Sequence, residues 1–155
     1  MPDTAYIALG ANLGDRRANI ESALEKLRQT PNLTLQKIST LIENPAIGGP
    51  ADSPPFLNGA AELQTTLSAA ELLTRLLEIE KDIGRVRREK WGPRLIDLDL
   101  LLYDNQIISE PNLTLPHPLL HARRFVLEPL AQIAPELVHP LLHKTIRALL
   151  AQLND

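Results

Sequence analysis

Residues 95–103 read Leu-Ile-Asp-Leu-Asp-Leu-Leu-Leu-Tyr, and the even-numbered positions are all Ile or Leu. Because side chains alternate across a β-strand, this stretch predicts an unbroken apolar face and an opposite face that carries Asp97, Asp99, Leu101 and Tyr103. The two carboxylates would lie side by side, with about 6–7 Å between their backbone positions. Asp is uncommon in strands and is rarely buried without a partner. The pair therefore indicates a cation site, although a sheet face exposed to water would give the same pattern.

The segment just before this strand supplies positive charge. Residues 84–94 read Gly-Arg-Val-Arg-Arg-Glu-Lys-Trp-Gly-Pro-Arg, with five cationic side chains beside one indole. Guanidinium groups suit phosphate oxygens, and carboxylate oxygens suit Mg²⁺. An ordinary solvated loop would also explain the charges, but their position next to Asp97 and Asp99 favours a site for a metal and a polyphosphate.

The composition predicts a single domain over residues 1–155, since 44% of the residues are hydrophobic and suffice for one core. A net charge of −3 argues against nucleic-acid binding, because duplex-binding domains usually carry a basic footprint. The absence of cysteine excludes disulfides and cysteine-ligated metals. No secretory or transmembrane segment is recognisable, so we expect a cytoplasmic protein with no membrane contact.

Apolar runs and helical periodicities predict the element order βαββαβ. The expected strands cover residues 6–9, 33–42, 56–64 and 95–103, and the expected helices cover residues 15–29 and 68–84. This order is typical of α+β ferredoxin-like folds, in which an antiparallel sheet carries both helices on one face and leaves the other free for a ligand. Helices expected over residues 126–133 and 145–153 would form a C-terminal appendage to that core.

Local signals refine the expected elements. Asp15 is expected to cap the first helix, and Ser68 with Glu71 matches a capping box at the start of the second. Residues 103–106 predict a hairpin turn that follows the last core strand. The apolar face of the second helix is expected to carry Leu72, Leu73, Leu76, Leu77 and Ile83.

Common motifs for nucleotides and metals are missing. None of the seven glycines is followed by Lys, so a nucleotide would have to bind without a P-loop. Two histidine pairs have the i, i+4 spacing of metal ligands on a helix, His117/His121 and His139/His143. In each pair proline follows the first His, and a residue before proline is biased away from helix, so we expect no zinc site. Phe56 and Asn58 share a strand face and offer a ring and an amide to a planar heterocycle, although a structural role fits them as well.

Five stretches together resemble the 6-hydroxymethyl-7,8-dihydropterin pyrophosphokinase family over nearly the whole chain. They are Tyr-Ile-Ala-Leu-Gly-Ala-Asn-Leu-Gly-Asp at 6–15, Phe-Leu-Asn at 56–58, Gly-Arg-Val-Arg with Trp-Gly-Pro-Arg-Leu-Ile-Asp-Leu-Asp at 84–87 and 91–99, Leu-Pro-His-Pro at 115–118, and Arg-Arg-Phe at 123–125. The resemblance implies a monomeric enzyme of folate biosynthesis. It would transfer diphosphate from ATP to the hydroxymethyl group of 6-hydroxymethyl-7,8-dihydropterin and release AMP.

The resemblance also implies roles for individual residues. Asp97 and Asp99 would hold two Mg²⁺ ions that bridge the ATP phosphates, while Arg85 and Arg94 would neutralise charge during the transfer. ATP would be bound by Glu80, Arg87, Trp91, Arg94, Leu100, Thr114, His117 and Arg123. The pterin would be bound by Asn44, Pro45, Ala46, Ile47, Phe56, Asn58, Asp97 and Phe125, with the two phenylalanines stacking on its ring.

Some positions depart from the family's pattern, and two other functions stay open. Leu77 and Asn112 stand where some members place a polar and a basic group near the nucleotide, and the segment between Arg85 and Trp91 is one residue short. One alternative is a non-catalytic ferredoxin-like module that binds a nucleotide or another anion. The other is a different magnesium-dependent phosphotransferase that acts on another planar heterocycle.

Overall fold

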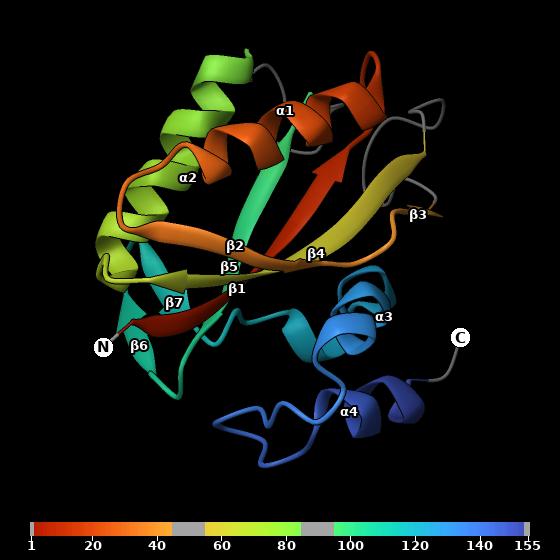
Figure 1. The fold of residues 1–155 in the computed structure, drawn as a ribbon. Helices are drawn as coiled ribbons and strands as arrows, with labels where there is room; N and C mark the ends of the chain where they lie inside the picture. Colours follow the sequence, from red (N-terminus) through yellow and green to blue (C-terminus); the bar gives the residue numbers. More distant parts are fainter. Residues whose placement is uncertain (1, 45–54, 85–94, 154–155) are drawn as a thin grey trace.

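The computed structural model describes residues 2–44, 55–84 and 95–153 and confirms the α+β ferredoxin-like architecture with an antiparallel sheet (Figure 1). Its elements are β1 (Asp3–Ala11), α1 (Arg16–Arg28), β2 (Leu33–Ile38), β3 (Ile42–Asn44), β4 (Phe56–Thr65), α2 (Ala69–Ile83), β5 (Asp97–Tyr103), β6 (Ile108–Glu110), β7 (Leu113–Leu115), the 3-10 helix η1 (Leu120–Ala122), α3 (Arg124–Ile133) and α4 (Ile146–Gln152). The main sheet has the strand order β2-β4-β1-β5, and β3 also pairs with β4.

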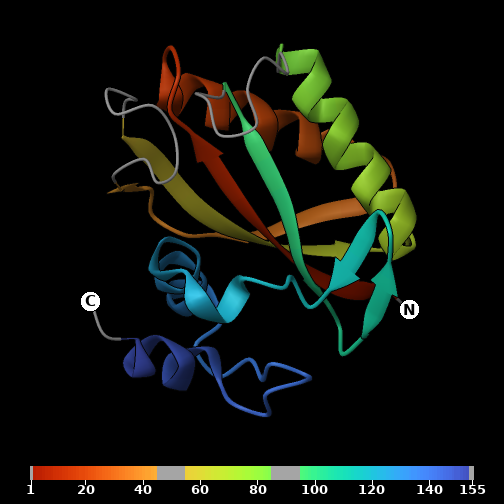
Figure 2. The same cartoon turned by 180° about the vertical axis from the view of Figure 1, so that it is seen from behind.

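The main sheet lies between two helical layers. Helices α1 and α2 cover one face, while η1, α3 and α4 lie on the other (Figures 1 and 2). The first layer buries residues such as Ile7, Leu24 and Leu76, and the second packs Leu127 and Leu130 against the sheet. The expected free face is therefore partly covered by the C-terminal appendage, because that appendage has an apolar surface of its own to bury.

Strand β5 departs from the predicted alternation after Leu100. Its pairing with β1 shifts by one residue, since Tyr6 lies opposite Leu102 while Ile7 lies opposite Leu100. Leu101 is the extra residue of this β-bulge. As a result Leu101 and Leu102 both pack with the C-terminal helices, and Tyr103 returns to the core under α1 and α2. The prediction that Leu102 continues the first apolar face, and that Tyr103 shares the aspartate face, is wrong.

Two other expectations about elements need correction. The predicted strand 33–42 is divided into β2 and β3, because the chain between them crosses over Gly59, where an added Cβ would lie 2.7 Å from Leu41. The predicted turn after β5 forms, with the Gln106 N–H donating to the Tyr103 carbonyl at 3.0 Å. It does not build a hairpin with β5, since β6 pairs with β7 instead.

The predicted helix signals are confirmed. Asp15 accepts from the Ala18 N–H, and Ser68 and Glu71 form both bonds of the capping box. Helix α2 ends at Gly84, whose φ of 104° favours glycine. Leu77 is not part of the buried face of α2, because its side chain is 44% exposed. No helix in the three described ranges is long and apolar enough to span a membrane.

Candidate active site

The register of strands β4, β1 and β5 brings several of the predicted site residues together on one sheet face. Gly10 of β1 lies opposite Asn58 of β4 on one side and opposite Asp97 of β5 on the other. Neighbouring strands are about 4.8 Å apart, so the Asn58 and Asp97 backbones lie about 10 Å apart across Gly10. Asp99 follows on the same face of β5, opposite Ala8. Near Gly10, which has no side chain, the sheet therefore carries the Asn58 amide on one side and the carboxylates of Asp97 and Asp99 on the other.

Gly10 leaves room for the close approach of the Asn58 amide. A Cβ added at this position would lie 3.0 Å from the Asn58 Nδ2 and 3.6 Å from the Phe56 Cδ1. The first distance is tighter than an ordinary contact, so the Asn58 amide would have to move, whereas the second is an ordinary van der Waals contact. Glycine therefore lets the Phe56 ring and the Asn58 amide lie over the central strand.

The Asn58 amide is oriented by a second amide. Asn44 donates from its Nδ2 to the Asn58 Oδ1 at 3.1 Å and to the Ile42 carbonyl at 3.3 Å. Because the Asn58 oxygen already accepts this bond, its NH₂ group is turned toward Gly10. The arrangement presents a donor over the sheet at the place where the sequence predicts a heterocycle.

The aspartate strand is tied to α2 by a buried carboxylate. Glu80 is only 3% exposed, and its Oε2 accepts the Leu98 N–H at 2.7 Å. Leu98 stands between Asp97 and Asp99, which are half-buried and exposed respectively. The bond therefore fixes the backbone from which both aspartates project.

A cavity of about 310 Å³ opens beside the aspartates between α2, β5 and the segment that follows β6. It is lined by Leu73, Leu77, Glu80, Asp97, Leu98, Asp99, Leu100, Pro111, Asn112, Leu113, Thr114, His117 and Pro118. Its lining thus includes both aspartates and four residues that were predicted to bind ATP, namely Glu80, Leu100, Thr114 and His117. Leu73, Leu98, Pro111, Leu113 and Pro118 were not predicted here, since an apolar residue carries no sequence signal that separates a cavity wall from a core.

His117 is held as a neutral acceptor at the cavity. Its Nδ1 accepts the Leu119 N–H at 3.1 Å, and its own backbone N–H donates to the Leu101 carbonyl at 2.9 Å. Burial lowers the pKa of the imidazole, and this effect together with the Arg123 charge outweighs the opposite influence of Asp99. Since Nδ1 is the acceptor, the neutral ring carries its proton on Nε2.

Arg123 and Phe125 lie at the start of α3. The Arg123 guanidinium carbon is 5.4 Å from the Phe125 ring centroid, a cation–π contact, and Phe125 packs against the core beneath α3 and α4. The remaining predicted site residues, Pro45, Ala46, Ile47, Arg85, Arg87, Trp91 and Arg94, lie outside the described residues.

The donor set at Asp97 and Asp99 suits Mg²⁺. Within the described residues no three His, Cys, Asp or Glu side chains converge on one point, so the site offers paired carboxylates and not a closed cage. Mg²⁺ is usually held in this manner, by one or two carboxylates together with substrate phosphates and water. A larger hollow of about 460 Å³ between α1 and α2 has none of the predicted residues and is walled by mixed surface charges.

Comparison with known proteins gives a consistent result. Residues 6–135 match the family model described as 7,8-dihydro-6-hydroxymethylpterin-pyrophosphokinase. The 2-amino-4-hydroxy-6-hydroxymethyldihydropteridine pyrophosphokinase of Pseudomonas aeruginosa is 45% identical over 141 residues, which cover 90% of this chain and 86% of that protein. The enzyme of the same name from Aquifex aeolicus is 42% identical over 144 residues, covering 93% and 88%.

Solved structures agree on the fold. Wild-type Plasmodium falciparum HPPK-DHPS with pteroate superposes with a TM-score of 0.76 at 15% identity and covers 98% of this chain. The wild-type protein with SDX-DHP gives a TM-score of 0.74 at 16% identity over 97% of this chain. The chain spans 43–44% of the length of these two structures. The family match and the close relatives establish that this chain belongs to the 7,8-dihydro-6-hydroxymethylpterin-pyrophosphokinase family and is a transferase, a pyrophosphokinase of folate biosynthesis.

Proposed function

We propose that the chain transfers the diphosphate group of ATP to the hydroxymethyl oxygen of 6-hydroxymethyl-7,8-dihydropterin and releases AMP. The observation that supports this most directly is the strand register, in which Gly10 separates Asn58 from Asp97. One side of the site offers an amide and a ring for a planar heterocycle, and the other offers carboxylates beside a cavity. An acceptor and a polyphosphate held on these two sides would meet above β1.

Asp97 and Asp99 would hold two Mg²⁺ ions, which neutralise and orient the ATP phosphates when bound. The task of the protein is then mainly to position both substrates, because attack on a polyphosphate is opposed by charge repulsion and needs no strong base. Arg85 and Arg94, to which the family resemblance gives the role of neutralising charge, keep that role in this proposal.

The nucleotide would occupy the cavity beside β5. Its walls combine the apolar side chains of Leu73, Leu77, Leu100 and Leu113 with the polar side chains of Thr114, Asn112 and His117. A few polar groups in an apolar pocket are typical of sites for planar bases. We also assign Glu80, Arg87, Trp91 and Arg123 to the binding of ATP.

The pterin would lie over Gly10. The Asn58 NH₂ group would donate to a ring acceptor, and Phe56 and Phe125 would contact the faces of the ring. Asn44 would fix Asn58, while Pro45, Ala46 and Ile47 would contribute from the adjoining segment. One copy of the chain carries both halves of the site, which supports a monomer. We also propose that it is cytoplasmic and that its partners are these small molecules and neither nucleic acid nor membrane.

The test is to incubate the purified protein with ATP, Mg²⁺ and the pterin and to separate the nucleotides by chromatography. The proposal expects AMP, formed only when the pterin is present and lost when EDTA removes the metal. Formation of ADP would indicate an ordinary kinase instead. A folded protein that binds ATP without any turnover would favour the binding-module alternative.

A second comparison addresses the acceptor. Other planar heterocycles with a hydroxymethyl group are added at equal concentration with the pterin. The proposal expects the pterin to be consumed first. Equal consumption of an unrelated heterocycle would favour the alternative phosphotransferase.

A further inference from the structure

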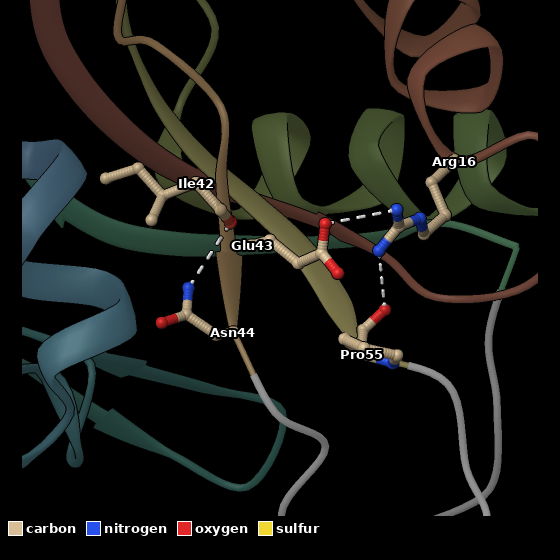
Figure 3. A network of polar contacts seen from close by, with 5 residues as sticks. All are labelled: Arg16, Ile42, Glu43, Asn44 and Pro55. Atoms are coloured by element: carbon tan, nitrogen blue, oxygen red, sulfur yellow. Dashed lines mark hydrogen bonds and ion pairs between the residues drawn. The ribbon is translucent and has the colours of Figure 1, made fainter.

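Arg16 connects two strand ends that lie far from it in the sequence. It is the first residue of α1, and its guanidinium reaches both Glu43 of β3 and Pro55, just before β4 (Figure 3). Nη1 donates to the Pro55 carbonyl at 3.0 Å, and Nη2 lies 3.4 Å from the Glu43 Oε2. The side chain is 28% exposed, against 58% for Glu43. The planar guanidinium supplies both contacts at once, which a Lys ammonium at one point does not.

The two residues that Arg16 contacts are neighbours of the predicted pterin residues. Glu43 precedes Asn44 at the end of β3, and Pro55 precedes Phe56 at the start of β4. Asn44 and Phe56 lie opposite each other in the β3–β4 ladder. Arg16 therefore holds together the end of the strand pair from which the Asn44 amide reaches Asn58.

Strand β3 depends on such support. It has only three residues and, within the described part of the chain, its one partner strand is β4. A strand this short has few ladder bonds, so its end frays unless something outside the ladder holds it. The Asn44 side chain can orient Asn58 only while β3 keeps its register.

The stability of α1 does not explain a cation at this position. The first turn of α1 carries Arg16 and Arg17 and no acidic residue. The positive end of the helix dipole disfavours cations there. Arg17 is exposed and has the same charge, which makes it a matched control for Arg16.

We propose that Arg16 is a positioning residue for the heterocycle side of the site: it fixes the β3–β4 end through Glu43 and Pro55, and so keeps the Asn44 amide on Asn58. This inference rests on the proposed function. Arg16 touches neither substrate, and its effect passes through Asn44 and Asn58 to the acceptor and not to the nucleotide.

The test compares Arg16→Met with Arg17→Met, since both remove one positive charge from the first turn of α1. KM is measured separately for the pterin and for ATP, together with kcat and the melting temperature. Arg16→Met should raise the pterin KM about 5- to 10-fold, since tenfold corresponds to about 1.4 kcal/mol, close to the contribution of one hydrogen bond to a charged group. The ATP KM should change less than about twofold, and the melting temperature should change little, since relief of the helix dipole offsets the lost contacts to Glu43 and Pro55.

Two further variants grade the effect. Arg16→Lys keeps the charge but loses the planar guanidinium that makes both contacts at once. Its pterin KM should therefore lie between the values of wild type and Arg16→Met. Glu43→Gln removes the ion pair and keeps the bond to Pro55, so its effect should be smaller than that of Arg16→Met.

A readout without turnover separates this inference from the proposed function. The side-chain NH₂ signals of Asn44 and Asn58 are followed by ¹H–¹⁵N NMR in the ligand-free protein and identified with Asn44→Ala and Asn58→Ala. Arg16→Met should shift both signals, and Arg17→Met should leave both in place. Unmoved signals, a pterin KM equal to that of Arg17→Met, or equal increases in both KM values would overturn the inference. If wild type makes no AMP while the signals shift as expected, the proposed function fails and the positioning contact stands.

Discussion

Asp97 and Asp99 carry the first prediction at the scale of single residues. Asp99 is exposed and Asp97 is half-buried, so neither holds the core together. Replacing either with Ala should lower kcat about 1,000-fold, because several kcal/mol of charge stabilisation at the phosphates is lost. For Asp99→Ala the free energy of unfolding should stay within about 0.5 kcal/mol of wild type.

AMP formation and urea unfolding measure the two effects. Glu21→Gln, which removes an exposed carboxylate from α1, serves as the control and should leave both unchanged. Near-normal turnover in either Ala variant would remove the metal role from that residue.

Glu80 gives the second prediction because its carboxylate is both buried and bonded to the aspartate strand. Glu80→Leu would leave the buried Leu98 N–H without its acceptor, which costs about 1–3 kcal/mol of unfolding free energy. Turnover should fall as well, since the backbone between the aspartates is no longer fixed. Glu80→Gln keeps an acceptor at the same place and should be milder in both measurements. Equal behaviour of the two variants would argue against the backbone bond as the cause.

At the scale of elements, the position of Glu80 depends on α2 and on its capping box. Ser68 accepts the Glu71 N–H at 3.1 Å while Glu71 accepts the Ser68 N–H at 2.8 Å. Ser68→Ala should lower the unfolding free energy by about 1 kcal/mol in urea titration. Ser109→Ala, at an exposed position of β6, is the control. No difference between the two variants would mean that water replaces the cap without cost.

The same elements show how far the sequence reveals the fold. The helices α1 and α2 were predicted closely, because their caps and their apolar spacing are local signals. Strand β5 was predicted up to Leu100, but the bulge at Leu101 was not, since the pairing partner of a strand decides where an extra residue is accommodated. The division into β2 and β3 was missed for a related reason, namely the close approach of Leu41 to Gly59.

The site was predicted in part and for a comparable reason. The paired aspartates and Asn58 stand out because Asp and Asn are uncommon in strands, and Phe56 stands out because aromatic residues are only 3% of this chain. Residues such as Leu73 and Pro118 were missed, because only the packing of α2 beside β5 makes them neighbours of a cavity. Tertiary contacts between distant segments leave no mark on local sequence.

At the scale of the whole molecule, the C-terminal appendage predicts a pH dependence of stability. His139 is buried, and its Nδ1 accepts the N–H groups of Leu141 and Leu142 at 3.2 and 3.1 Å. Burial lowers the pKa of His139 below its ordinary value of 6.5, and the nearby His121 and His143 lower it further. The folded state therefore favours the neutral ring, and below about pH 6.5 the unfolded chain binds more protons.

The resulting stability is present above pH 6.5 and is lost as the pH falls through the folded pKa. His139→Asn keeps an acceptor for the two N–H groups but does not titrate. The difference in unfolding free energy between wild type and His139→Asn should be constant above about pH 6.5 and should decrease below it. Urea titrations from pH 7.5 to pH 5 measure it, and a flat difference throughout would refute the role of His139.

The hydrogen bonds along the outer edge of β5 limit strand pairing between molecules of this protein. An exposed strand offers unpaired N–H and C=O groups to any extended peptide, and such edges seed aggregation. Here the Glu80 carboxylate accepts a hydrogen bond from the Leu98 N–H, and the His117 N–H donates to the Leu101 carbonyl at 2.9 Å. A foreign strand could pair at these positions only by displacing a buried carboxylate and a backbone bond. Two residues that line the cavity beside β5, Glu80 and His117, therefore also keep the edge of the sheet from pairing with a further strand.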